Sequence, residues 1–386
     1  MNSDTTYQRL GDYIREVNVR NRDLKVTNLL GVNLSKKFFP SIANIIGTDL
    51  SKYKVIRKGQ FGCKFMSVGR DGILPVSIMK DDEPAIISSA YYVFEVRDEN
   101  VLLPDYLMMW LRRPEFDRQL AFYAGADVRG GVNYDDFCEM PIIIPSIARQ
   151  REIVAEYETL TNRIRLNEQI IAKLEATAQA LYRKMFVDGV DKENLPEGWR
   201  RGTIENICEV RDGTHDSPKP VEKGCPLVTS AHLSPWTVLL DQTYFISFQD
   251  YKKINERSLV ETKDILYSMI GTVGTISFVS YEKVEFAVKN MAIFKTSHNS
   301  KYAEYLLFFL KSEEMNLYIA GSMSGSTQNY VTLNTLRETP ILIPETNQIE
   351  QFHKIAAIIV TYISKITLEN LKLTELQSLL LARMGK

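Results

Sequence analysis

The sequence has few of the residues that build metal sites and disulfide frameworks. Its 386 residues include four cysteines and four histidines, and no two of either type are close neighbours. Structural zinc sites and disulfide scaffolds need such residues at short spacings, so neither is expected, and scattered thiols suit a reducing compartment. The residues are Cys63, Cys138, Cys208, Cys225, His215, His232, His298 and His353.

Long apolar runs are also missing. No segment approaches the ~18 consecutive apolar residues that a membrane-spanning helix requires. The opening stretch MNSDTTYQRLGDYI lacks the basic start and apolar centre of a signal peptide. We therefore expect a cytoplasmic protein with no membrane partner. A hydrophobic content of 45% and a charged content of 25% fit a chain with real cores, divided into two or three domains of about 100–200 residues.

The net charge of −1 conceals an uneven distribution. Residues 9–80 carry 14 Lys and Arg against 5 Asp and Glu, a local charge of +9, whereas residues 81–139 carry 5 against 13, a local charge of −8. A basic half beside an acidic half suggests one face turned toward a polyanion. The alternative is an ordinary solvated surface with chance clustering.

The chain repeats itself at a distance of about 200 residues. EMPIIIPSIARQREIV begins at Glu139, and ETPILIPETNQIEQFHKIA begins at Glu338. A period this long is unlike a solenoid and indicates two copies of one module. With an offset of 199 the matched pairs are Tyr106 and Tyr305, Leu107 and Leu306, Leu111 and Leu310, Val132 and Val331, Pro141 and Pro340, and Pro145 and Pro344.

Each module ends in a long helical pattern, expected at about residues 147–185 and 349–384. The apolar residues alternate steps of four and three, a spacing that buries itself only against another helix, here the other copy, running antiparallel. Polar residues interrupt the two patterns at equivalent places, Asn167 and Glu369. They either meet across the pair or mark a place where one helix bends outward. The expected interface comprises Ile153, Tyr157, Leu160, Ile164, Asn167, Ile171, Leu174, Ile355, Ile359, Tyr362, Ile366, Glu369, Leu373 and Leu376.

These features resemble the specificity subunit of a Type I restriction–modification system. The segments that carry the resemblance are LPEGWRRGTIENICEVRDGTHDSPKP from Leu195, SMIGTVGTISFV, VKNMAIFK, SGSTQNYVTLNTLRETPILIP and LNEQIIAKLEATAQALYRKMF. The resemblance covers essentially the whole chain. It implies an α+β fold with two target recognition domains, at 1–145 and 195–345. Spacer helices at 146–187 and 346–386 would pair as an antiparallel coiled coil with pseudo-twofold symmetry, and 188–194 would be a linker.

The same resemblance implies a non-catalytic reader of a bipartite, asymmetric site in double-stranded DNA, in a bacterium or archaeon. Two methyltransferase subunits would dock on the chain and carry S-adenosylmethionine, so that the chain itself holds no cofactor. Restriction subunits would join the full complex and cut DNA.

The motifs of an enzyme are missing. An adenine methyltransferase grips the flipped base with an Asn-Pro-Pro-aromatic motif, and no Asn-Pro-Pro occurs. The P-loop pattern is also absent, and GTVGT at 271–275 fits a turn better than a cofactor loop. The carboxylates of VETKDI at 260–265 match a nuclease only by a common Glu-x-Lys spacing. No catalytic residue is therefore expected.

Candidate DNA contacts are cations for phosphates and polar side chains for base edges. Arg129 and Gln328 occupy matching polar loops and suit guanine and adenine, although they could equally brace their loops or face the methyltransferase. His215 is the residue type that stabilises a turn, and Lys219 is the better phosphate contact. The full set is Lys36, Lys37, Lys52, Lys54, Lys58, Lys64, Arg70, Arg129, His215, Lys219, Thr229, Ser230, His232 and Gln328.

Two rival functions use the same features. A coiled-coil scaffold would join proteins and have no DNA role, and a diverged enzyme would cut or methylate DNA alone. Salt-dependent binding of a duplex separates the first from a specificity subunit, and activity without a partner separates the second.

Overall fold

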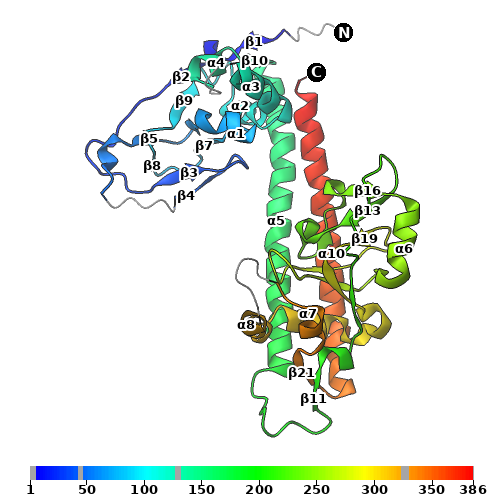
Figure 1. The fold of residues 1–386 in the computed structure, drawn as a ribbon. Helices are drawn as coiled ribbons and strands as arrows, with labels where there is room; N and C mark the ends of the chain where they lie inside the picture. Colours follow the sequence, from blue (N-terminus) through cyan, green and yellow to red (C-terminus); the bar gives the residue numbers. More distant parts are fainter. Residues whose placement is uncertain (1–5, 42–46, 127–131, 323–329, 386) are drawn as a thin grey trace. The chain divides into compact units, whose positions relative to one another are not determined.

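The computed structural model describes residues 6–41, 47–126, 132–322 and 330–385. The chain divides into two compact units (Figure 1). Unit 1 comprises Met1–Ile164 and Leu373–Lys386, and unit 2 comprises Arg165–Lys372. The division passes through both long helices, α5 (Ile147–Phe186) and α10 (Thr346–Arg383). Each unit therefore contains one part of each helix.

Unit 1 is built on an antiparallel sheet with strand order β2-β9-β6-β7, and three further strand pairs are β1 with β10, β3 with β4 and β5 with β8. Phe61 and Phe94 stack with ring centroids 4.8 Å apart in the core. Pro104 opens α2 at a position where its missing N–H is harmless. The strands are β1 Gln8–Arg9, β2 Ile14–Glu16, β3 Leu30–Val32, β4 Phe38–Pro40, β5 Lys54–Ile56, β6 Phe61–Cys63, β7 Val76–Ile78, β8 Ala85–Ile87, β9 Tyr92–Val96 and β10 Pro141–Ile142; the helices are α1 Val68–Asp71, α2 Pro104–Leu111, α3 Pro114–Ala126 and α4 Tyr134–Cys138.

Unit 2 repeats this plan with a larger sheet region. The four-stranded sheet has the order β12-β20-β17-β18, and β16-β13-β19, β14-β15 and β11-β21 form smaller sheets. The strands are β11 Arg200–Thr203, β12 Val210–Asp212, β13 Cys225–Val228, β14 Leu233–Ser234, β15 Thr237–Val238, β16 Tyr244–Ile246, β17 Ile265–Ser268, β18 Ile276–Phe278, β19 Ala287–Val288, β20 Met291–Phe294 and β21 Pro340–Ile343; the helices are α6 Phe248–Ser258, α7 Ala303–Leu310, α8 Glu313–Ser322 and α9 Leu333–Arg337.

The duplication is visible in atomic contacts. Helices α2 and α7, and helices α4 and α9, begin and end at positions 199 residues apart. Inside unit 1 the Tyr106 hydroxyl donates to the Ile143 carbonyl at 2.9 Å, and inside unit 2 the Tyr305 hydroxyl donates to the Leu342 carbonyl at 2.5 Å. A buried tyrosine needs such a partner. The repeat in the sequence therefore corresponds to a repeated fold.

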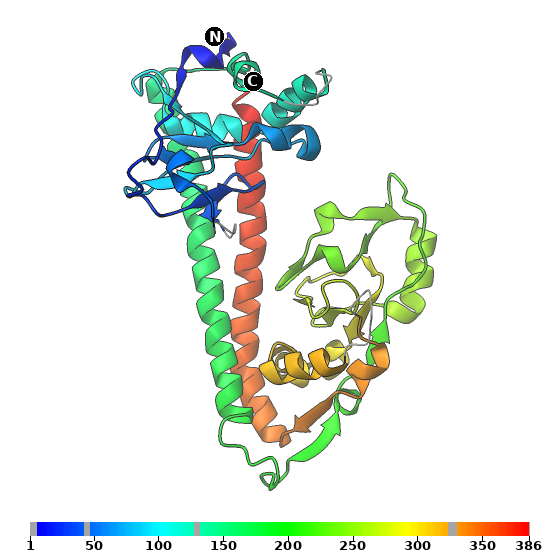
Figure 2. The same cartoon turned by 60° about the vertical axis from the view of Figure 1, so that its left-hand side comes forward.

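Within each unit, the parts of α5 and α10 that belong to it lie side by side (Figures 1 and 2) and run antiparallel. In unit 1, Gln377 Nε2 donates to Thr161 Oγ1 at 2.7 Å. In unit 2, Asn167 Nδ2 donates to Glu369 Oε2 at 3.1 Å and to Asn370 Oδ1 at 2.8 Å. Higher numbers in one helix therefore face lower numbers in the other. The α+β fold with a paired antiparallel helix is confirmed, and the polar interruptions meet across the pair.

The predicted register is wrong for part of α10. Ile355, Tyr362 and Leu376 are exposed, at 50%, 52% and 49% of their surfaces. Ala356 and Ile363, each one residue further along, are buried instead. Alanine contributes little to an apolar pattern, so the spacing alone favoured Ile355 over the buried Ala356, and the same shift of one residue applies at Tyr362. Ile359, Ile366, Glu369 and Leu373 are buried or half-buried, as are the predicted residues Ile153, Tyr157, Leu160, Ile164, Asn167, Ile171 and Leu174 of α5.

Each unit completes its core with the far end of a long helix. Ala178, Tyr182 and Phe186, at the end of α5, belong to the core of unit 2. Leu381 and Met384, at the end of the chain, belong to the core of unit 1. There the Tyr7 hydroxyl also donates to the Gly385 carbonyl at 3.2 Å. Residues near the two ends of the described chain are thus joined within unit 1.

Candidate nucleic-acid interface

Two of the lysines predicted to bind phosphate lie inside unit 1, which corrects those predictions. Lys36 is buried, and its Nζ donates to both carboxylate oxygens of Asp117, at 2.8 and 2.7 Å, and to the Leu111 carbonyl. Burial lowers the pKa of Lys36, and the charge of Asp117 opposes that shift. Lys54 is buried as well, with Nζ 3.6 Å from a Glu16 carboxylate oxygen. Both lysine side chains are buried, so neither ammonium is presented to a phosphate, although Glu16, the partner of Lys54, is itself exposed.

Most of the other predicted cations of unit 1 are exposed but engaged. Lys58 pairs with Asp82 at 2.6 Å, and Arg70 pairs with its neighbour Asp71 at 2.8 Å. Such exposed pairs are weak, about 0–1 kcal/mol, so either cation could exchange its partner for a phosphate. Lys52 lies 3.5 Å from Asp49, Lys64 lies over the Tyr91 ring at 5.9 Å, and Lys37 is exposed with no ion pair among the described residues. The basic stretch of the sequence is therefore largely neutralised within its own unit.

The two loop residues predicted to read bases, Arg129 and Gln328, lie outside the described residues. The segments that follow them are well anchored. Asn133 caps α4 by accepting from the backbone of Asp135 and Asp136, and Val331 donates from its backbone to the Met269 carbonyl at 3.0 Å. Base contact by Arg129 and Gln328 stays a prediction.

His215 fastens the turn after β12. Its Nε2 is 2.8 Å from Asp212 Oδ2, and its Nδ1 is 2.9 Å from Asn290 Oδ1. The hydrogen bond with Asn290 and the charge of Asp212 raise the pKa of His215, because a protonated ring donates at both nitrogens. Lys219, further along the same turn, is exposed and has no ion pair within the described parts of the chain. The contacts of His215 therefore fix this turn, and the turn exposes the ammonium of Lys219 to solvent.

Thr229, Ser230 and His232 form a local cap. They lie at the end of β13, where the short 3-10 helix Ser230–His232 begins. The Thr229 N–H donates to His232 Nδ1 at 3.0 Å, and burial lowers the pKa of the ring. The hydrogen bonds of Thr229 and His232 serve this turn, so the structure explains both residues without a ligand.

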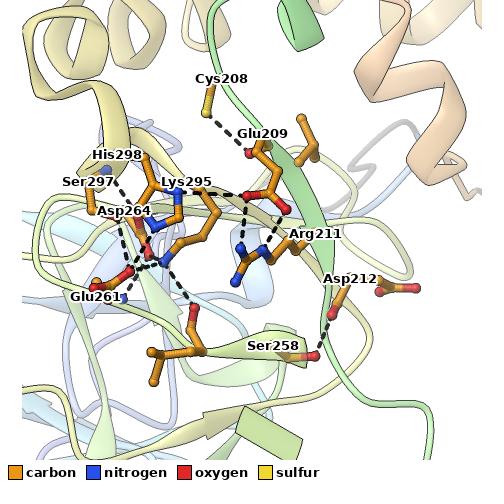
Figure 3. A network of polar contacts seen from close by, with 12 residues as sticks. Cys208, Glu209, Arg211, Asp212, Ser258, Glu261, Asp264, Lys295, Ser297 and His298 are labelled. Atoms are coloured by element: carbon orange, nitrogen blue, oxygen red, sulfur yellow. Dashed lines mark hydrogen bonds and ion pairs between the residues drawn. The ribbon is translucent and has the colours of Figure 1, made fainter. Parts of the chain in front are cut away.

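The acidic residues of the Glu-x-Lys segment surround a buried lysine (Figure 3). Lys295 is fully buried, and its Nζ donates to the Leu259 carbonyl at 3.0 Å, to Glu261 at 2.8 Å and to Asp264. An ammonium with three acceptors is fully satisfied. Within the described ranges, no group of three or more His, Cys, Asp and Glu residues is arranged to hold a metal ion. This network has the features of a structural ion cluster.

Helix α6 carries cations that the sequence analysis missed. Lys252, Lys253 and Arg257 are exposed on its outer face, and none has an ion pair among the residues that the structure describes. The opposite face is buried through Ile254 and Ser258. The signal was present in FQDYKKINERS, where apolar and charged residues separate onto two faces at helical spacing. No helix was predicted over these residues.

Helix α10 has an exposed apolar stripe. Ile355, Ile358 and Tyr362 lie at i, i+3 and i+7 on one face, and Ile358 is 71% exposed. A shallow cleft of about 400 Å³ lies beside the stripe, lined by Ala357, Ile358, Thr361, Tyr362 and Lys365.

None of the helices in the described parts of the chain has the length and apolar character that crossing a bilayer requires.

The chain thus has two similar α+β units, each of which includes part of both long helices. The family model of the Type I restriction modification DNA specificity domain matches residues 73–176 and 196–378. The chain belongs to this family, whose members recognise DNA sequences, and the predicted family is confirmed.

Curated relatives match the chain over 59% and 99% of its length. The Type I restriction enzyme HindI specificity subunit of Haemophilus influenzae is 22% identical, with 99% of each chain covered. The MjaIX specificity subunit of Methanocaldococcus jannaschii is 24% identical over 59% of this chain and 57% of its own. The crystal structure of the Type I restriction–modification system S subunit from M. genitalium has a TM-score of 0.57 at 14% identity, covering 100% of this chain and 97% of that one. This last similarity supports the fold.

Proposed function

We propose that this chain is the non-catalytic DNA-reading subunit of a Type I restriction–modification enzyme, and that it reads a bipartite site with one half for each unit. The observation that carries the proposal is the duplicated fold on an antiparallel helix pair, in a chain of the specificity family. Two similar but unequal readers suit two different half-sites. Helix α5 has 40 residues, so it is roughly 60 Å long. That length exceeds one turn of duplex, about 34 Å.

The catalytic chemistry then belongs to partners. Two methyltransferase subunits would bring S-adenosylmethionine, and restriction subunits would join through them in the cytoplasm. The exposed stripe of α10 supports docking, because apolar residues at helical spacing fit a groove or helix on another protein. No cofactor is assigned to this chain.

Docking is tested by Ile358→Glu in the full chain, coexpressed with the methyltransferase subunit of the same host. A charge on the stripe would be buried without a partner on binding, so copurification should fall at least tenfold. Leu317→Glu is the control, because Leu317 is similarly exposed, at 67%, on α8. Equal copurification of both variants would contradict docking at the stripe.

The function as a whole is tested by mapping methylated adenines in DNA from cells that express the chain with its methyltransferase. The expected motif has two short defined blocks separated by an undefined spacer. A motif in one uninterrupted block would contradict the bipartite reading. Failure of the chain to bind any duplex in a salt-dependent manner would favour the scaffold, and methylation or cleavage by the chain alone would favour a diverged enzyme.

A further inference from the structure

We propose that α6 is the recognition helix of unit 2, and that its outer face enters the major groove of one half-site. This inference rests on the proposed function and specifies which surface reads DNA. Helix α6 has 11 residues, about 16 Å of helix, and the major groove is wide enough to admit an α-helix. Figure 1 shows α6 at the edge of unit 2, beside β13, β16 and β19.

The chemistry of the outer face fits base edges. Gln249, Lys253 and Arg257 are spaced by four residues, so they form one exposed line along the helix. Glutamine pairs with adenine through two hydrogen bonds, and lysine and arginine pair with guanine. The neighbouring line begins with Phe248, which is 63% exposed, and continues through Lys252. The face therefore combines side chains that read bases with cations for the flanking phosphates.

The charges on this face are available for a polyanion. Lys252, Lys253 and Arg257 make no ion pair with the residues that the structure describes, and the only carboxylate exposed along the same face is Glu256. The predicted phosphate-binding lysines of unit 1 are different, because Lys36 and Lys54 are buried in ion pairs. Charge complementarity thus selects DNA as the occupant of this face.

The helix is held firmly from behind, which precise reading requires. Ser247 caps its first turn by accepting from the Asp250 N–H at 3.0 Å. At the other end the Ser258 hydroxyl donates to the Asp212 carbonyl at 2.6 Å. Asp212 also binds His215. The α6 face and the turn that presents Lys219 are consequently fixed to the same residue of β12.

Unit 1 has no equivalent of α6 among its described residues. Strands β6 and β17 hold the same place in the two four-stranded sheets. Helix α6 precedes β17, whereas the described residues between β2 and β6 form strands and the 3-10 helix Leu50–Lys52. The two units would therefore read their half-sites with different elements.

Two variants of the full chain test the proposal on a synthetic duplex that carries the mapped motif. Lys252→Ala should reduce the slope of log affinity against log salt by about one, for one lost phosphate contact. The control, Lys184→Ala, removes the same charge from an exposed position at the end of α5 and should leave the slope unchanged. Gln249→Ala should make one base position of one half-site degenerate, with at least a tenfold loss of discrimination there.

All of these residues are exposed, so the melting temperatures of the variants should equal that of the wild type. A variant with a folding defect would be recognised by a lower melting temperature. An unchanged slope and motif in the α6 variants, with a wild-type chain that reads both half-sites, would overturn the recognition helix and leave the proposed function standing. A wild-type chain with no preference for the motif over a scrambled duplex would overturn the proposed function itself.

Discussion

The two units treat their positive charges differently. In unit 1, Lys36 is buried against Asp117, and the exposed Lys58 is paired with Asp82. In unit 2, the buried cation Lys295 is neutralised in a similar way, but α6 carries exposed cations without a carboxylate partner in the described structure. The local charge of a sequence therefore does not show which cations the fold leaves available to a polyanion. A cation can bind a polyanion only if it is exposed and has no carboxylate partner. Whether it has one depends on which carboxylates the fold brings close to it.

The largest expected effect on DNA binding comes from disrupting the α5–α10 helix pair, to which both units contribute. Ile164→Asp together with Ile366→Asp places one charge in the helix pair of each unit, and Ile366 is only 4% exposed. Unpaired buried charges cost several kcal/mol, so binding to the two-block site should be lost. Gel-shift titration measures the loss. The control, Leu166→Asp with Leu371→Asp, changes exposed positions on the same helices and should bind normally. Retained binding in the first variant would mean that the pair is dispensable.

A smaller loss is expected from unpairing the buried lysine of unit 1. Asp117→Ala leaves the Lys36 ammonium without its carboxylate and should destabilise the protein by about 3–5 kcal/mol. Asp82→Ala removes only the exposed partner of Lys58 and should cost less than about 1 kcal/mol. Chemical denaturation of both variants gives the difference. Equal stabilities would show that burial does not separate the two classes of ion pair.

A change in helix length should alter the spacing of the half-sites and leave the blocks intact. Four residues inserted after Ala178 lengthen α5 by about 6 Å and keep the apolar stripe approximately in phase. The spacer should grow by one or two base pairs, because a duplex rises about 3.4 Å per pair. Motif mapping of the variant decides the point. An unchanged spacer with full methylation would mean that another part of the molecule sets the distance.

The smallest effect concerns His215, for which unit 1 offers no counterpart among its described residues. The pKa of His215 is raised above its ordinary value, chiefly by the hydrogen bond with Asn290 and then by the charge of Asp212. A raised pKa in the folded state means that the stabilisation is full below about pH 6.5 and is lost as the pH rises through the folded pKa. His215→Gln should remove this dependence, which the melting temperature at each pH would report. If NMR gave His215 in the folded protein a pKa below that of free imidazole, the stabilising contacts of His215 with Asp212 and Asn290 would be contradicted.

The fold was more predictable than the site, and particular residues show why. The α5 register followed from its apolar spacing, because the residues that alternate in steps of four and three are the ones that the fold buries or half-buries. In α10, Ala356 and Ile363 are buried where Ile355 and Tyr362 were expected, because an alanine gives little pattern signal. The burial of Lys36 depends on Asp117, which is 81 residues away, and no local pattern reveals such a pairing. Helix α6 has a two-faced charge and apolar pattern in FQDYKKINERS, but no helix was predicted over these residues.

The way each unit finishes its core has a consequence for how the protein is made. The core of unit 1 includes Leu381 and Met384, and Tyr7 binds the Gly385 carbonyl. Synthesis proceeds from the N-terminus, so unit 1 leaves the ribosome with an incomplete core and must wait for the end of α10 before it can close. Unit 2 waits less, since the α5 residues that it needs precede it in the sequence. Unit 1, which is translated first, is therefore expected to be the last to become fully folded.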